Sequence, residues 1–343
     1  MTSDFSTRLF RIVFVLAGCY NLAFGVWVGF WPAHLFELLA IEQPRYLPIW
    51  SCVGMVVGVY GFLYWHVVWK PDRGRPIVAV GLLGKVLGPI GMALSFSDTW
   101  PLRLALLNLY NDVIWWLPFS LFLIRGTQFA KWVVPLAPWC CAVLHILGLL
   151  AGALALQNGT LAESDLLQRA AYIAQHPARW ACGWSIWMFA AASLVAFYAW
   201  WGSRLKARYA GLSAVLLAAL GSVFDMSGES ISILFVLERA QLLVEQTTDW
   251  TQAEFLWQER ISVWLTAGAA NLLYTLAGLL LMLRTRGLPA HVKWAMWLTW
   301  ILGLVMTAAA VANHVGGMMV STALLFPLLI YWTLWMGWRW RPD

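Results

Sequence analysis

The segment between Arg260 and Arg284 reads ISVWLTAGAANLLYTLAGLLLML (residues 261–283) and contains no charged residue. As an α-helix it would rise about 35 Å, enough to cross the ~30 Å hydrocarbon core of a bilayer. Backbone hydrogen bonds in lipid are satisfied only by helices and closed barrels. A barrel needs short strands of alternating polarity, which this continuous apolar run does not provide. The segment therefore predicts a transmembrane helix.

The rest of the chain has the same character. Of its 343 residues, 62% are apolar and 11% are charged, whereas soluble domains have roughly 45–50% apolar and about 25% charged residues. The 22 basic and 16 acidic residues are too few to cover the surface of a soluble protein of this size. This composition excludes a soluble enzyme, a nucleic-acid binder, a disordered chain and a disulfide-rich secreted module. It predicts an all-α, polytopic integral membrane protein.

A window of about 19 residues finds ten candidate transmembrane segments. The apolar run of the first segment includes LAGC at residues 16–19, which is similar to a lipoprotein cleavage site, but it continues to Trp31. We therefore expect an uncleaved helix there. The ten predicted spans are 12–31, 47–69, 77–97, 104–124, 132–156, 180–202, 209–236, 261–283, 294–312 and 319–337.

The basic residues predict the orientation of these spans. Fifteen lie in the termini and joints of one side, six lie on the other side, and Lys85 lies within a span. Because the basic side of a membrane protein is cytoplasmic, we expect both termini in the cytoplasm, in the inner membrane of a bacterium. The two longest joints, 157–179 and 237–260, are then external. They form either short helices on the outer face or ordered connectors.

The first polar cluster at membrane depth lies on the third and fourth predicted spans. Lys85 and Asp112 lie at similar depths by helical rise, and Asn108 shares a helical face with Asp112 while Asn111 lies beside it. We predict a Lys85–Asp112 ion pair, either a structural clasp or a functional proton relay or head-group anchor. Pro89 removes the N–H that would bond the Lys85 carbonyl, which is left for another partner.

The second polar cluster is predicted near the outer face. Asp225 and Glu229 are four residues apart on one helix, so they share a face and repel each other unless a cation, a proton or a base intervenes. By helical rise, His314 ends its span at the same level, and His176 also lies outside. Asp225, Glu229 and His314 are therefore candidate catalytic acids and bases. Together with His176 they are candidate ligands of a divalent metal. The alternative is a solvated outer vestibule.

Several aromatic side chains are predicted in the middle of spans rather than at the membrane interfaces. Trp115, Trp116, Trp187 and Trp264 either line a pocket for a flat lipid, isoprenoid or quinone, or fill space between helices. His145 lies within the fifth predicted span and is expected to be a hydrogen-bonded core histidine.

The first third of the chain resembles a known family. The segments CYNLAFG (residues 19–25), GKVLGP (84–89) and NDVIWWLP (111–118) carry the resemblance to DoxX-like four-helix bacterial membrane proteins. That group includes quinone-linked oxidoreductase subunits and lipid- or cargo-handling proteins, so the resemblance implies a module that holds a hydrophobic small molecule between its helices. We therefore expect a four-helix module at residues 1–131 and a six-helix module at residues 132–343.

These observations predict a membrane protein that binds a lipid-like or quinone-type molecule within its helix bundle. It would act on that molecule through the outer Asp225, Glu229 and His314 cluster, with a divalent metal or a quinone as the candidate cofactor. Membrane lipids, a hydrophobic small molecule and partner subunits are the expected partners, and nucleic acid is not. Two alternatives are a proton- or cation-coupled transporter and a structural subunit of a larger membrane complex. The sequence leaves open whether the protein is an enzyme.

Overall fold

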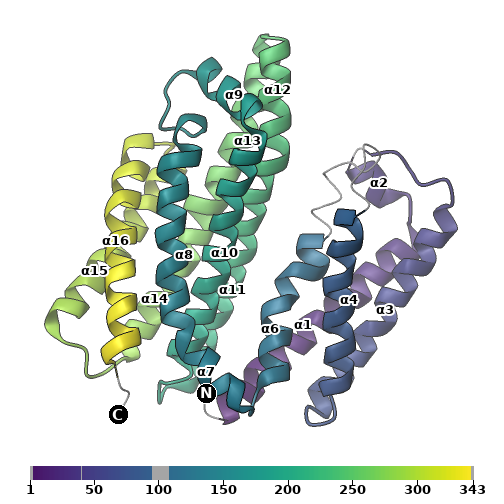
Figure 1. Cartoon of the computed structure of the whole chain (residues 1–343), viewed down its shortest axis with the longest axis vertical. Coiled ribbons are helices and arrows are strands. Elements are labelled where there is room, and N and C mark those ends of the chain that lie inside the picture. Colours follow the sequence, from purple (N-terminus) through teal and green to yellow (C-terminus); the bar gives the residue numbers. More distant parts are fainter. Residues whose placement is uncertain (1–2, 40, 95–107, 341–343) are drawn as a thin grey trace. The chain divides into compact units, whose positions relative to one another are not determined.

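A computed structural model describes residues 3–39, 41–94 and 108–340 (Figure 1). The described residues form helices and connecting segments without a β-strand, which confirms the all-α fold class. The chain divides into two compact units, with the boundary between Lys131 and Trp132.

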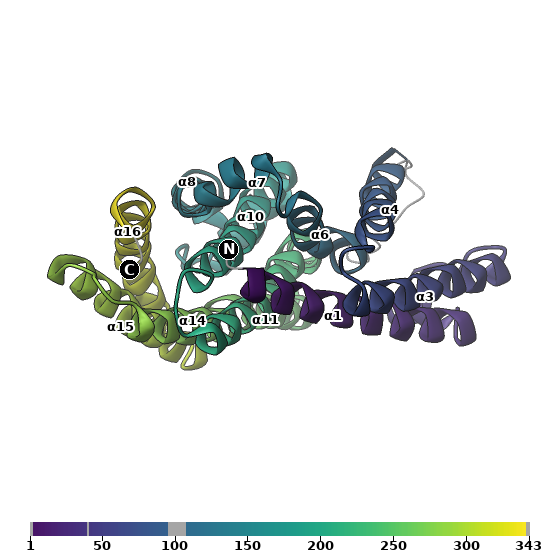
Figure 2. The ribbon, with the colours of Figure 1, turned by 90° about the horizontal axis from the view of Figure 1, so that it is seen from below.

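The N-terminal unit contains four long apolar helical segments and a short helix, α2. Helices α1 and α3 lie side by side along most of their length (Figure 2). Their backbones touch where a Cβ on Gly25 would lie 2.5 Å from the Cα of Gly58, so glycine is required there. Small residues permit such close approach in lipid. The helices are α1 (Ser3–Phe30), α2 (His34–Leu38), α3 (Leu47–Trp69), α4 (Arg75–Leu94), the π-helical turn η2 (Leu109–Val113), α6 (Ile114–Ile124) and α7 (Gln128–Val133), which crosses the boundary.

Aromatic side chains form the core of the N-terminal unit. Phe14 of α1 packs against Phe119 and Phe122 of α6, with ring centroids 5.2 Å and 4.8 Å apart. Tyr64 of α3 packs edge-on against Phe119 at 5.1 Å. All four side chains are buried. Aromatic pairs in these tilted and edge-on arrangements add to the free energy of simple burial, so this cluster joins three helices of the unit.

The C-terminal unit is built from long helices, several of which contain a π-helical segment. Proline lies at the first or second position of α8 and α10, where its missing N–H leaves no helical hydrogen bond unmade. The elements are η3 (Val134–Leu136), α8 (Ala137–Ala151), η4 (Gly152–Leu156), η5 (Gln157–Gly159), α9 (Leu166–Gln175), α10 (Pro177–Gly202), α11 (Arg208–Ile231), η6 (Ser232–Val236), α12 (Leu237–Glu245), α13 (Asp249–Val263), η7 (Trp264–Ala270), α14 (Asn271–Arg284), α15 (Ala290–Val311) and α16 (Val315–Arg339).

Buried tryptophans hold one end of the C-terminal unit together. The indole N–H of Trp201 donates to the hydroxyl of Thr285 at 2.9 Å, and that of Trp332 donates to Thr299 at 3.2 Å. Both tryptophan side chains are fully buried, with their rings 5.6 Å apart. Each of these donors therefore has a partner that compensates its removal from water or lipid headgroups.

Two helices are much longer than a bilayer requires. Elements α11, η6 and α12 form one continuous helix of 38 residues, and α13, η7 and α14 form another of 36 residues. At 1.5 Å per residue these helices measure about 57 Å and 54 Å, against a hydrocarbon core of ~30 Å. The two helices are therefore each more than about 20 Å longer than a perpendicular crossing of this core requires. We call α9, α12 and α13 the headpiece (top of Figure 1).

The headpiece changes the interpretation of the two long external joints. The joint 157–179 does contain a short helix, α9, whose N-terminus is capped by the Asp165 side chain. The joint 237–260 is not a loop on the membrane surface, because its residues continue the two long helices, which are interrupted only around Thr247 and Thr248. The hydropathy of the sequence shows only where the apolar residues end. The two helices continue further, and Thr248, which caps the N-terminus of α13, separates one helix from the other.

Within the described residues, nine helices are long and apolar enough to cross a membrane, which makes the chain a multi-pass membrane protein. Each of them overlaps one of the ten predicted spans. The remaining prediction, 104–124, corresponds to the shorter apolar helix Leu109–Ile124; its first residues and the end of the span 77–97 lie outside the described part. The count of ten and the cytoplasmic position of the termini stay predictions.

Cysteine labelling tests the predicted orientation. In a variant without the native cysteines, Gln246→Cys at the tip of the headpiece should react with a membrane-impermeant maleimide added to intact cells. Lys206→Cys, in a basic joint, should react only after the membrane is opened. Both positions are exposed in the structure, so access depends on the side of the membrane. Labelling of Lys206→Cys alone in intact cells would reverse the orientation.

Candidate functional site

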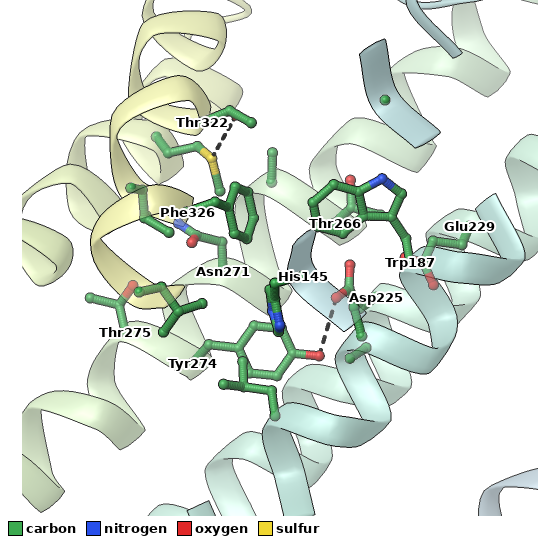
Figure 3. A pocket seen from close by; sticks show the side chains of 18 of the residues that line it. His145, Trp187, Asp225, Glu229, Thr266, Asn271, Tyr274, Thr275, Thr322 and Phe326 are labelled. Atoms are coloured by element: carbon green, nitrogen blue, oxygen red, sulfur yellow. Dashed lines mark hydrogen bonds between the residues drawn. The ribbon is translucent and has the colours of Figure 1, made fainter. Parts of the chain in front are cut away.

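A cavity of about 320 Å³ lies within the C-terminal unit (Figure 3). Its walls come from α8, α10, α11, α14, α15 and α16 and from the π-helical segments η4 and η7. Apolar surface makes up most of the lining and polar side chains are set into it, which is typical of small-molecule sites. The polar and aromatic lining residues are His145, Thr160, Trp184, Trp187, Tyr198, Asp225, Glu229, Thr266, Asn271, Tyr274, Thr275, Thr299, Trp300, Thr322 and Phe326.

Two acidic side chains of α11 line this cavity. The hydroxyl of Tyr274 donates to Oδ2 of Asp225 at 3.2 Å (Figure 3). Glu229 is 2% exposed, and its Oε2 has no hydrogen-bond partner among the described residues. Residues four apart on a helix are about 6 Å from each other, where two carboxylates repel by about 3 kcal/mol at an effective dielectric constant of ~20. The pair therefore calls for a proton or a cation.

His145 contributes an imidazole to the cavity wall from α8. Its Nδ1 lies 2.7 Å from the carbonyl oxygen of Cys141. A carbonyl oxygen only accepts, so Nδ1 carries the proton, and Nε2 of the neutral ring is an acceptor. The ring packs against Phe326 at 5.7 Å and edge-on to Trp187 at 6.4 Å. The prediction of a hydrogen-bonded core histidine is confirmed, and the residue additionally lines the cavity. Trp187 likewise lies on the cavity wall, as the pocket alternative predicted.

Local helix irregularities shape the cavity. The lining includes Gly152 and Leu156 of η4 and Thr266 and Ala267 of η7. A π-helical turn inserts one extra residue, displaces the neighbouring side chains from the α-helical register, and is frequent at functional sites. A Cβ added to Gly152 would meet nothing within 4 Å. The space beside this residue is therefore open and can be filled by substitution.

The predicted histidines of the outer cluster do not join the carboxylates. His314 is the N-cap of α16, and its Nδ1 accepts the N–H of Gly317 at 2.9 Å. Nδ1 of His176 lies 3.0 Å from the carbonyl oxygen of Tyr172, and the imidazole stacks on the Tyr172 ring with the ring centroids 4.6 Å apart. Neither histidine lines the cavity.

The structure therefore does not bring together the four predicted metal ligands, Asp225, Glu229, His314 and His176. Throughout the described ranges, no three His, Cys, Asp or Glu side chains gather in a way that could hold a metal ion. The physical reason is that both histidines serve the ends of helices, where unpaired backbone groups need partners. His314 is also separated from the proposed catalytic role with the two carboxylates, which face the cavity without it.

The N-terminal unit holds the first predicted cluster. The structure brings Lys85 and Asp112 together, with Nζ 3.9 Å from Oδ1 and both side chains buried. The ammonium also donates to the carbonyl of Asn111 and lies 5.8 Å from the ring centre of Trp115. The Asn111 amide donates to Oδ1 of Asp112 at 2.9 Å, whereas the Asn108 amide is directed at the sulfur of Met92. The Asn108 amide nitrogen is thus turned towards Met92 rather than towards the ion pair.

The backbone around Lys85 explains how the pair is accommodated. The prediction that Pro89 frees the Lys85 carbonyl is confirmed, because the indole of Trp116 donates to that oxygen at 3.0 Å. A Cβ on Gly88 would lie 3.0 Å from Oδ2 of Asp112, so glycine at this position leaves room for the carboxylate. Asp112 itself lies in the π-helical turn η2. The cluster thus depends on a local departure from regular helix geometry.

One buried ion pair escaped the sequence analysis. In the headpiece, Arg169 of α9 contacts Glu259 of α13 through two parallel hydrogen bonds of 2.8 Å each. The Arg169 guanidinium also donates to the carbonyl of Glu163 at 2.7 Å. The side chains of the pair are 5% and 9% exposed. Such bidentate, buried pairs fix geometry more strongly than exposed ones, so this contact positions α9 against the long helices.

Comparisons with protein-family models, with curated proteins and with solved structures give no match to this chain. The resemblance of the first third to DoxX-like proteins accordingly stays a prediction. The function has to be argued from the cavity and its lining residues.

Proposed function

We propose that residues 132–343 bind an amphiphilic small molecule, lipid-like or quinone-type, inside the membrane. The observation that carries this proposal is the cavity of about 320 Å³, which lies at the lower end of the usual range for ligand sites. Its aromatic walls suit a flat or branched apolar body. Asp225 and Glu229 lie on α11 where the polar part of such a molecule would be held.

Unsatisfied polar groups support a resident ligand. The indole N–H groups of Trp184 and Trp300, both on the cavity wall, are buried and have no partner among the described residues. The same holds for one oxygen of Glu229. A buried polar group without a partner costs about 1–3 kcal/mol, so three such groups around one cavity favour a molecule or water that supplies the missing hydrogen bonds.

The cavity also bears on the two alternative functions, a structural subunit and a coupled transporter. A purely structural subunit requires no internal space, so the cavity argues against that alternative. A proton- or cation-coupled transporter would use the same two carboxylates, and the unpartnered Glu229 keeps it as the second candidate. We further propose that the protein resides in the bacterial inner membrane with both termini in the cytoplasm, because the basic residues are concentrated on that side.

Filling the cavity tests the proposed function. Wild-type protein in nanodiscs should retain a hydrophobic molecule that native mass spectrometry detects, and Gly152→Phe should lower its affinity about tenfold or more, which corresponds to ~1.4 kcal/mol. Position 152 is suitable because Gly152 lines the cavity and nothing lies within 4 Å of a Cβ added there. Ala153→Phe is the matched control, since Ala153 is exposed and does not line the cavity. Equal occupancy in all three proteins, or none in folded wild type, would overturn the proposal.

A further inference from the structure

We propose that the molecule bound in this cavity is an organic cation: an ammonium group attached to an apolar body. The inference rests on the proposed function and names the chemical class of its ligand. It follows from the charge of the lining residues, from the partners of the two carboxyl groups, and from the aromatic walls around them.

The charge of the lining is one-sided. Among the described residues that line the cavity, two are acidic, none is Lys or Arg, and one is a histidine. The histidine uses Nδ1 on the Cys141 carbonyl, and it is 3% exposed among apolar neighbours, where the neutral ring is favoured. Burying an ionised group is costly unless an opposite charge accompanies it. The lining provides no Lys or Arg for this purpose, so the carboxyl groups either take up a proton or meet a cation that enters with the ligand.

The hydrogen-bond partners of the two carboxyl groups also favour a cationic ligand. Asp225 accepts one hydrogen bond from Tyr274, which anchors it without neutralising it. Glu229 is almost completely buried and offers an unused oxygen. An ammonium group would satisfy both the charge and the lone pairs. A quinone offers only carbonyl acceptors, which repel carboxylate oxygens, and it would be favoured only where the carboxyl groups carry protons.

The walls add a second element of cation recognition. Trp187, Tyr274 and Phe326 face the same space as the carboxyl groups (Figure 3). The other tryptophan and tyrosine side chains of the lining are Trp184, Tyr198 and Trp300. The faces of aromatic rings attract cations, and ammonium groups in aromatic cages are a common use of this attraction. The same rings accommodate the apolar body. The cavity thus combines negative charge with aromatic faces, the two features that distinguish an ammonium head from a neutral one.

The experiment compares two probes of equal shape. Phenyltrimethylammonium and tert-butylbenzene differ in having nitrogen or carbon at the branching atom, so only charge separates them. Binding is measured by equilibrium dialysis against wild-type protein in nanodiscs, with the uptake of protein-free nanodiscs subtracted. We expect the cation to bind at least about tenfold more tightly than the neutral probe. Glu229→Gln should remove most of that preference while leaving the affinity for tert-butylbenzene unchanged.

A control variant and a measurement of stability distinguish loss of binding from loss of folding. Glu254→Gln, on the headpiece and away from the cavity, should bind both probes as wild type does, and the melting temperature of each variant shows that it is folded. Equal binding of the two probes by wild type, or a preference for the neutral one, would overturn the cation inference but leave the proposed function standing. Binding of neither probe would overturn the cation inference, and the failure of Gly152→Phe to alter retention of the native ligand would overturn the proposed function.

Discussion

Glu259→Ala should accelerate amide hydrogen exchange in the headpiece by about 100-fold or more. The substitution leaves the Arg169 guanidinium buried at 5% exposure, with the Glu163 carbonyl as its remaining hydrogen-bond acceptor. Removing one partner of a buried ion pair typically costs ~3–5 kcal/mol. Because each ~1.4 kcal/mol changes an opening equilibrium tenfold, the local opening of α9 becomes much more frequent. Exchange is measured by mass spectrometry on peptides from residues 157–179 in nanodiscs.

Glu254→Ala is the matched control for this experiment. Glu254 lies on the same helix, but its contact with Arg239 is long, at 3.8 Å, and its side chain is 33% exposed. Ion pairs of this kind contribute about 0.2–1 kcal/mol, so exchange should rise about fivefold at most. If Glu259→Ala and Glu254→Ala gave the same rates, the buried pair would not be what holds α9 in place.

The double variant Arg169→Met/Glu259→Leu separates charge from packing. It removes both buried charges and replaces them with apolar side chains, which in other proteins is often neutral or stabilising. We expect exchange rates close to those of wild type. The ion pair would then serve to select one position of α9 on the long helices rather than to add net free energy of folding.

The sequence predicts the membrane spans because the bilayer imposes a simple physical requirement on them. A segment that crosses the bilayer has to be long, continuous and apolar, and each such segment of this chain corresponds to an observed helix. It also predicts local relations that follow from helix geometry. The free carbonyl of Lys85 and the shared face of Asp225 and Glu229 both follow from spacing along one helix, whereas the partner of that carbonyl, Trp116, comes from another helix.

The headpiece was less predictable because hydropathy measures preference for lipid, not helix length. Between Gly228 and Gly268 the chain has no proline and no glycine, which is a sequence signal that helices continue beyond the apolar residues. The Arg169–Glu259 pair spans 90 positions of the sequence. No periodicity relates such residues, so this contact is visible only once the helices are packed.

The cavity also contains contacts between helices that the sequence does not predict. Asn271 and Tyr274 are polar residues three apart within a span that has no charged residue, which marks one face of α14 as unusual. That signal could have placed Tyr274 beside the carboxylates, yet it does not tell which helix faces α14. His314 was placed with Asp225 by depth alone. Depth fixes the level of a residue in the membrane but not the direction of its side chain, so this histidine ended at a helix cap.

Lys85→Met should lower the free energy of unfolding of the N-terminal unit by about 3 kcal/mol. Without the ammonium, Asp112 stays buried with the Asn111 amide as its remaining polar contact. Unfolding of the full-length protein in mixed detergent micelles, followed through the fluorescence of tryptophans in this unit, measures the loss. Lys70→Met is the control, because Lys70 is exposed at the end of α3 and its substitution should change stability by about 0.5 kcal/mol or less.

The matching double variant decides what the pair is for. Lys85→Met/Asp112→Leu removes both charges, so it should recover most of the stability lost in Lys85→Met. If the double variant is as stable as wild type, the pair is a clasp between α4 and the turn η2. If the double variant stays as unstable as Lys85→Met, the charges make contacts in this unit that apolar side chains do not replace. Equal stability of Lys85→Met and Lys70→Met would contradict a buried pair altogether, since an exposed lysine contributes little and a buried one cannot be removed at no cost.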